Sequence, residues 1–129
     1  MPRYLHTSIF VNDMDESIKF YTEQLGLKLL GGPNHYPGNA DMAFVGADWN
    51  SYIELVYDLE AHDPYAIGNR YEHLAIEVEG DLRGFMETLR AAGVKILKDV
   101  KSAPGGGRAI AFVEDPNGIP VELLEPRSA

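Results

Sequence analysis

The stretch HLAIEV at residues 73–78 repeats the stretch HTSIFV at residues 6–11, 67 positions earlier in the chain. GLKLL at 26–30 returns as GVKIL at 93–97 with the same offset. Two further segments return with an offset of 68: AFV at 43–45 as AFV at 111–113, and IELV at 53–56 as VELL at 121–124. Four matches in the same order indicate a duplicated module with one residue inserted in the second copy.

Each copy predicts one strand, one helix and then three strands. In the first copy, the β-rich residues 4–11 precede Asp13 and Glu16, which suit a helix N-terminus, and Gly26 suits its end. The three strands are expected near 27–31, 41–46 and 51–57.

The second copy predicts the same elements. Its first strand falls within residues 72–79, and its helix presents Leu82, Phe85, Leu89 and Ala92 on one face and ends at Gly93. Strands are expected near 94–98, 108–113 and 119–125, with a hairpin turn at Asp-Pro-Asn-Gly, residues 115–118.

The expected fold class is α+β: two tandem βαβββ modules, at about 4–57 and 72–126, in one domain spanning residues 1–129. Residues 58–71 would link the modules. Each module would form a curved mixed sheet with a helix on its outer face. The opposite, concave face would remain available to enclose a ligand.

Composition excludes several classes of function. The chain has 129 residues, 45% of them hydrophobic, which suffices for one domain with a real core. It contains no cysteine, so disulfides and thiolate metal ligands are excluded. The formal net charge of −9 argues against a nucleic-acid partner. We expect no membrane segment and, because no secretory signal is recognisable, a cytoplasmic location.

The segment AFVEDPNGIPVELLEP at residues 111–126 places Glu122 in an apolar strand, on the same face as Pro120 and Leu124. Glu54 occupies the equivalent place in the first copy. A buried carboxylate is costly unless it is paired or bound to a cation. The repeated first strands each supply a histidine, His6 and His73.

These two imidazoles and two carboxylates would balance one divalent cation. Each residue alone would more often be solvent-facing or satisfied by a nearby backbone group, but their equivalent places in a repeat weaken that alternative. The other histidines, His35 and His62, have no counterpart and are expected to be ordinary surface residues.

The segments LHTSIFVNDMDESIKFYTEQLGLKLL, YAIGNRYEHLAIEV and AFVEDPNGIPVELLE resemble the glyoxalase I (lactoylglutathione lyase) family of the vicinal oxygen chelate superfamily. The resemblance covers about residues 4 to 126. It implies a divalent metal, with Ni²⁺ or Co²⁺ favoured and Zn²⁺ possible, and a homodimer whose sites are shared between chains. It implies the metal ligands His6, Glu54, His73 and Glu122.

The resemblance also implies a reaction: isomerisation of the hemithioacetal of methylglyoxal and a thiol to an S-lactoyl thioester. Glu122 would be the main catalytic base, and Glu54 would be the partner carboxylate. The same fold also serves ligand-binding resistance proteins, epimerases and dioxygenases, which are the alternatives.

The glutathione contacts of the family carry over poorly. Phe10 stands where the family usually has an arginine, and Asp58 where it usually has an asparagine. Glutathione or another thiol could therefore be the co-substrate. The expected substrate contacts are Phe10, Asp58, Tyr71 and Arg108, with Lys101 an alternative to Arg108. The glycine run at 105–107 predicts a flap over the site rather than a phosphate loop, because no Lys-Ser/Thr follows it.

Overall fold

The computed structural model describes residues 1–102 and 107–127, and the chain divides into two compact units, Met1–Ala66 and Ile67–Ala129. The division falls within the stretch 58–71 that the repeat marks as a linker. Gly105 and Gly106, the centre of the predicted flap, lie outside the described residues. No helix in the described part of the chain is long and apolar enough to cross a bilayer.

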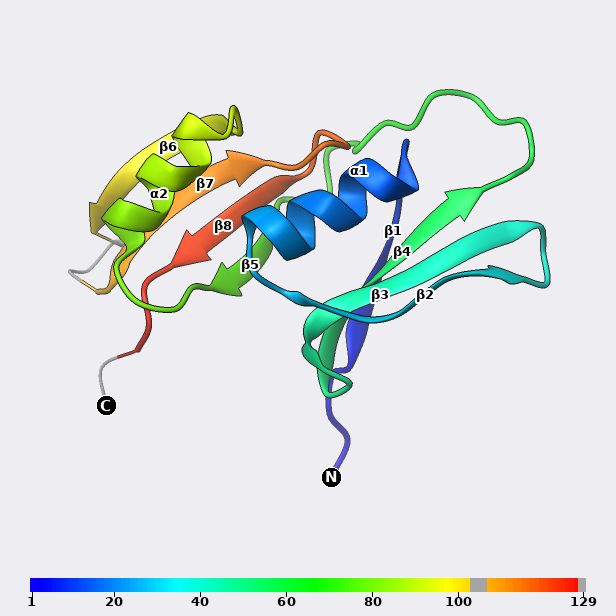
Figure 1. Ribbon diagram of the computed structural model, residues 1–129, viewed down its shortest axis with the longest axis horizontal. Helices are drawn as coiled ribbons and strands as arrows, with labels where there is room; N and C mark the ends of the chain where they lie inside the picture. The colour runs from blue at the N-terminus through cyan, green and yellow to red at the C-terminus, as the bar shows by residue number, and fades with distance from the viewer. Residues whose placement is uncertain (103–106, 128–129) are drawn as a thin grey trace. The chain divides into compact units, whose positions relative to one another are not determined.

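The first unit is one βαβββ module (Figure 1). Its elements are β1 (His6–Phe10), α1 (Met14–Lys19), a π-helical turn η1 (Phe20–Gln24), β2 (Lys28–Tyr36), β3 (Ala40–Asp48) and β4 (Ser51–Asp58). The strands form one sheet in the order β1-β4-β3-β2. β1 and β4 run parallel, and the other pairs are antiparallel.

The second unit repeats this topology. Its elements are β5 (Leu74–Glu77), α2 (Leu82–Ala91), β6 (Lys95–Ser102), β7 (Ala109–Glu114) and β8 (Pro120–Leu124). The sheet order is β5-β8-β7-β6, again with the first and last strands parallel. The predicted fold class, an α+β chain of two tandem βαβββ modules, is confirmed.

The duplication extends to the strand register. Ser8 lies opposite Glu54 on the parallel pair of the first unit, and Ala75 lies opposite Glu122 on that of the second. On the antiparallel side, each glutamate faces a phenylalanine: Phe44 opposite Glu54 and Phe112 opposite Glu122. Since register fixes which side chains share a face, the two glutamates occupy equivalent environments.

Side-chain alternation divides each sheet into two faces. Ile53 and Leu55 of β4 are buried among the core residues, whereas Glu54 between them lies on the opposite, partly exposed face. In β8, Val121 and Leu123 are fully buried and Glu122 lies on the other face. The apolar face packs under the helix of its unit, so both carboxylates lie on the helix-free face.

The first helix begins at its expected cap, Asp13, and the second begins at Asp81, which the sequence reading had not named. The side chain of Asp13 accepts a hydrogen bond of 2.8 Å from the N–H of Glu16, and Asp81 accepts from the N–H groups of Arg83 and Gly84. The first helix does not run regularly to Gly26, because its last turn is the π-helical segment η1. Gly26 follows with a φ of +88°, a conformation that favours glycine.

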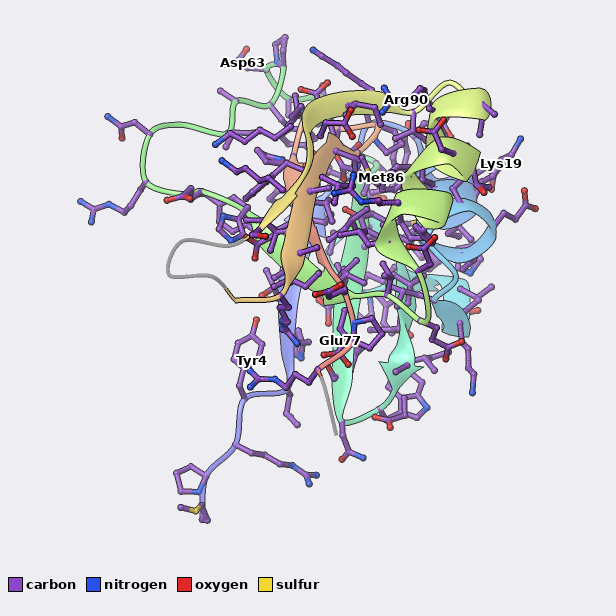
Figure 2. The ribbon with its side chains drawn as sticks, turned by 90° about the vertical axis from the view of Figure 1, so that its left-hand side faces the viewer. Tyr4, Lys19, Asp63, Glu77, Met86 and Arg90 are labelled. Atoms are coloured by element: carbon purple, nitrogen blue, oxygen red, sulfur yellow. The ribbon has the colours of Figure 1, made fainter. Side chains whose placement is uncertain are left out.

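The expected apolar face of α2 was partly wrong. Leu82 and Leu89 are buried as expected, but Met86 rather than Ala92 completes the stripe. Met86 lies four residues after Leu82, on the side of the helix that faces the strands (Figure 2). Ala92 is exposed because the helix ends at Ala91 and Ala92 is its C-cap.

The predicted hairpin turn joins β7 to β8. Asp115 is almost fully buried, and its Oδ1 atom accepts hydrogen bonds of 2.8 Å from the N–H groups of Asn117 and Ile119. Gly118 has a φ of +83° and donates its N–H to the carbonyl of Asp115. This turn sets the register of β8 and therefore the face on which Glu122 lies.

Candidate metal centre

The first unit brings two of the predicted ligands together. Nε2 of His6 lies 3.5 Å from Oε2 of Glu54, and the two side chains are 33% and 18% exposed. The imidazole ring stacks on Tyr52 at a centroid distance of 4.8 Å. The other carboxylate oxygen, Oε1, accepts a hydrogen bond of 2.8 Å from the Oγ atom of Ser8.

The second unit forms the equivalent pair. Nε2 of His73 lies 3.7 Å from Oε1 of Glu122, with side-chain exposures of 28% and 17%. Phe112 presents its ring edge-on to the imidazole at 5.2 Å. The sequence had placed His73 on the first strand of the second unit. In the structure His73 directly precedes that strand, β5. Its Nδ1 atom lies 3.1 Å from Oε1 of Glu72.

The geometry of both pairs suits a shared cation. Separations of 3.5 and 3.7 Å exceed an ordinary hydrogen bond. Two ligand atoms bound to one ion at about 2.0–2.2 Å lie about 3.0–3.5 Å apart. Small side-chain adjustments would therefore let the nitrogen and the oxygen of each pair bind the same cation. Nitrogen and carboxylate oxygen are also the donors that divalent first-row metals accept.

The Nδ1 atoms of the two imidazoles differ in their surroundings. A histidine that binds a cation through Nε2 carries its proton on Nδ1, which normally donates to a nearby acceptor. In the second unit, the carboxylate of Glu72 fills that role for His73. In the first unit, Nδ1 of His6 is buried with no hydrogen-bond partner among the described residues.

Each unit contributes two donors and no more. Across residues 1–102 and 107–127, no group of three or more His, Asp or Glu side chains is placed to hold a metal ion. A site with all four predicted ligands therefore requires a pair of each kind.

An aromatic cluster surrounds the first pair, and only part of it could be anticipated. Phe44 lies opposite Glu54 in the sheet, and Trp49 contacts both Phe44 and Tyr52 at centroid distances of 5.3 and 5.2 Å. Strand alternation could have placed Phe44 and Tyr52 on the face of Glu54. Trp49 belongs to the tight β3–β4 turn, so alternation gives no information about it.

Two of the expected substrate contacts lie near one another in the first unit. Phe10 is half exposed, and its ring stacks on Tyr65 at 5.0 Å. Asp58 ends β4 and accepts a hydrogen bond of 2.9 Å from the N–H of Glu60. The pKa of Tyr65 is raised by partial burial and by the negative charge of Asp58 and Tyr57, so its hydroxyl stays protonated at neutral pH.

The other two expected contacts lie in the second unit. The guanidinium of Arg108 forms an ion pair with Glu77, with an Nη1–Oε2 distance of 2.8 Å, so its charge is already compensated. Glu77 occupies the position equivalent to Phe10. Tyr71 is exposed in the stretch that precedes β5, and Lys101 is exposed on β6.

Comparison with known proteins agrees with this architecture. A profile described as Glyoxalase/Bleomycin resistance protein/Dioxygenase superfamily matches residues 3–123. A lactoylglutathione lyase of Haemophilus influenzae is 38% identical over 127 residues, which cover 96% of this chain and 93% of that protein. A lactoylglutathione lyase of Salmonella typhimurium is 37% identical over 130 residues, covering 98% and 95%.

Solved structures give the same result. Glyoxalase I from Zea mays matches with a TM-score of 0.86 and 33% identity over 98% of this chain, which spans 46% of the maize chain. The trypanothione-dependent glyoxalase I of Leishmania major matches with a TM-score of 0.80 and 36% identity, covering 97% of this chain and 87% of that one. The predicted family resemblance is confirmed, and relatives of nearly equal length support a glyoxalase I-like activity over a non-enzymatic binding role.

Proposed function

Because the chain belongs to the Glyoxalase/Bleomycin resistance protein/Dioxygenase superfamily, we propose that it is a glyoxalase I-type lyase. Its substrate is the hemithioacetal formed by methylglyoxal and a thiol, and its product is the S-lactoyl thioester. The supporting observation is the pair of His–Glu contacts, at equivalent repeat positions and nearly equal separations of 3.5 and 3.7 Å. The near full-length identity to lactoylglutathione lyases supports the same conclusion.

We take His6, Glu54, His73 and Glu122 as the ligands of one divalent cation per site. When bound, this cation supplies Lewis acidity that stabilises negative charge on the substrate oxygens. Ni²⁺ or Co²⁺ is the favoured ion, and Zn²⁺ is compatible with the same donors. The absence of cysteine and the mixed nitrogen and oxygen donors support a divalent ion of this group, and the preference for Ni²⁺ or Co²⁺ follows from the family resemblance.

The reaction is an internal proton transfer, for which the chain itself supplies the base. The carboxylate of Glu122 takes the proton from the carbon that bears sulfur and hydroxyl, and returns it to the neighbouring carbonyl carbon. The hydroxyl proton passes to the neighbouring oxygen, so that the first carbon becomes the thioester carbonyl and the second becomes the alcohol. No atom is gained or lost, so the product is an isomer of the substrate.

The difference between the two carboxylates supports this division of roles. Glu54 is oriented by the hydroxyl of Ser8, whereas Ala75 opposite Glu122 has no side-chain donor. A carboxylate that must approach and leave carbon benefits from that freedom. Glu54 then acts as the partner carboxylate.

We further propose a homodimer with two shared sites. One chain supplies His6 and Glu54, and the second pair is His73 and Glu122 of the partner subunit. The supporting observation is that each unit forms one His–Glu pair, so a four-ligand site needs one pair from each kind of unit. A closed two-fold arrangement gives two equivalent sites. Both modules then serve one functional domain spanning residues 1–129, and we expect the enzyme to work in the cytoplasm.

The decisive experiment combines metal analysis with an isomerase assay. The purified protein is stripped with a chelator, reloaded separately with Ni²⁺, Co²⁺ or Zn²⁺, and assayed with methylglyoxal and several thiols. We expect about one ion per site, and activity that disappears on stripping and returns on reloading. A protein that takes up none of these ions, or that loads fully yet turns over no thiol adduct, would contradict the proposal.

A further inference from the structure

The first unit carries an exposed stack of three rings beside a carboxylate. Phe10 and Tyr65 stack at a centroid distance of 5.0 Å and an interplanar angle of 10°, and Tyr65 stacks on His62 at 4.2 Å and 21°. Phe10 is 53% exposed, so part of its ring is open to a ligand. We call Phe10, Asp58, His62 and Tyr65 the aromatic–acidic patch.

This patch lies in line with the first His–Glu pair. Phe10 shares its face of β1 with His6 and Ser8, because they are separated by even numbers of residues. Asp58 shares its face of β4 with Glu54 for the same reason. Val56 lies between these two residues on that face, and Phe10 lies opposite Val56. Four residues of β-strand separate Glu54 from Asp58, which corresponds to about 13 Å.

The chemistry of the patch favours positive charge. An aromatic face attracts an ammonium group, and more strongly with a carboxylate beside it. Among the described residues Asp58 forms no ion pair, and its negative charge contributes to the raised pKa of Tyr65. The second unit differs, since Glu77, at the position equivalent to Phe10, is neutralised there by Arg108.

We propose that the aromatic–acidic patch is the thiol-recognition subsite, and that it selects thiols whose end remote from sulfur is an ammonium group over thiols that end there in a carboxylate. The inference rests on the proposed function, in which the reacting carbons lie at the His–Glu pairs. Phe10 lies two strand positions, about 7 Å, beyond Ser8, which is opposite Glu54. A thiol about the length of a tripeptide, roughly 10 Å when extended, spans that distance. Its ammonium group then lies over the ring of Phe10 or Tyr65 and near the carboxylate of Asp58.

The test compares three thiols built on one scaffold. They are glutathione, its diester with both carboxylates neutralised, and glutathione whose glycyl carboxylate is amidated with ethylenediamine. All three keep the γ-glutamyl ammonium group, and only the third presents an ammonium group at the glycyl end. Turnover of the methylglyoxal adducts is measured as kcat/KM with the metal-loaded enzyme. Affinity of the three S-methyl thioethers is measured separately by calorimetry, so the comparison does not depend on turnover.

We expect the ammonium form to exceed glutathione at least fivefold in kcat/KM and in affinity, with the diester between them. Asp58→Asn should reduce this ratio about twofold to fivefold, as expected for one partly exposed charge pair. Phe10→Arg should reverse the order in favour of glutathione. Asp48→Asn is the matched control. Asp48 accepts a hydrogen bond of 2.7 Å from the N–H of Asn50, just as Asp58 accepts one from the N–H of Glu60. Asp48 lies at the opposite end of the sheet from Asp58.

The outcomes separate this inference from the proposed function. If the enzyme turns over glutathione adducts best and Asp58→Asn leaves the ratios unchanged, the subsite assignment is wrong and the glyoxalase assignment stands. If no adduct is turned over but the ammonium thioether still binds tightest in an Asp58-dependent manner, the subsite stands and the reaction is wrong. Equal effects of Asp48→Asn and Asp58→Asn on the thiol ratios would show that the preference for the ammonium thiol depends only on the net charge of the protein. That outcome would overturn the subsite assignment.

Discussion

Ser8 donates a hydrogen bond of 2.8 Å to Oε1 of Glu54, whereas Ala75 fills the equivalent position opposite Glu122. The two units are otherwise matched residue for residue in the register around these glutamates. One hydroxyl therefore distinguishes two carboxylates that the duplication made alike.

Ser8→Ala should weaken metal binding about tenfold or more, because a hydrogen bond that orients a ligating carboxylate typically contributes this much. The second unit folds with alanine at the equivalent position, so the substitution should leave the fold intact. Metal affinity is measured by competition with a chromogenic chelator, and folding by thermal unfolding of the metal-free protein. Ala75→Ser is the reciprocal variant and should slow turnover by restraining Glu122. Unchanged metal affinity in Ser8→Ala would show that Ser8 does not orient Glu54.

Glu122→Gln should lower kcat by at least a hundredfold, because an amide cannot accept the substrate proton. Metal content must be measured in the same sample, since Glu122 is also a proposed ligand. Glu114→Gln is a suitable control: it removes a carboxylate from the neighbouring strand β7, where it pairs with Lys95 at 3.4 Å. Near-normal turnover in a metal-loaded Glu122→Gln enzyme would exclude Glu122 as the base.

Shared sites can be tested by complementation. A chain with His6→Ala and Glu54→Ala is unfolded and refolded together with a chain that carries His73→Ala and Glu122→Ala. Each variant alone should be inactive because all its sites lack a ligand pair. The mixed dimer should regain one complete site, so activity and metal should return on mixing. Heterodimers that form but remain inactive and metal-free would show that the sites are not shared in this way.

Gly46→Ala should destabilise the first unit by about 1–3 kcal/mol, the usual cost of forcing extra volume into a packed site. A Cβ at this position would lie within 2.8 Å of the backbone and Cβ of Tyr52, whose ring stacks on His6. Gly31→Ala is the control on the adjacent strand, because its Cβ would make ordinary contacts of 3.5 Å with Trp49. Chemical denaturation compares the two variants, and equal midpoints would contradict the packing argument.

The placement of the candidate ligands was predictable because strands alternate with a period of two. The repeat offsets of 67 and 68 already matched Glu54 with Glu122, and the fold then required both to lie on the helix-free face. The helical period was less reliable for α2. It missed Met86, which is buried. It included Ala92, which is exposed because the helix ends at Ala91, one residue earlier than expected.

By itself, the sequence determined the duplicated βαβββ modules, the family, and the four residues most suited to hold a cation. It did so because duplication and strand alternation are periodic, and a periodic pattern can be recognised in the sequence alone. Only the tertiary structure decided that Ser8 reaches Glu54, that Arg108 is neutralised by Glu77, and that Phe10, Tyr65 and His62 stack beside Asp58. These contacts join residues between 3 and 55 positions apart, so they depend on how strands and loops converge in space and leave no periodic trace in the chain.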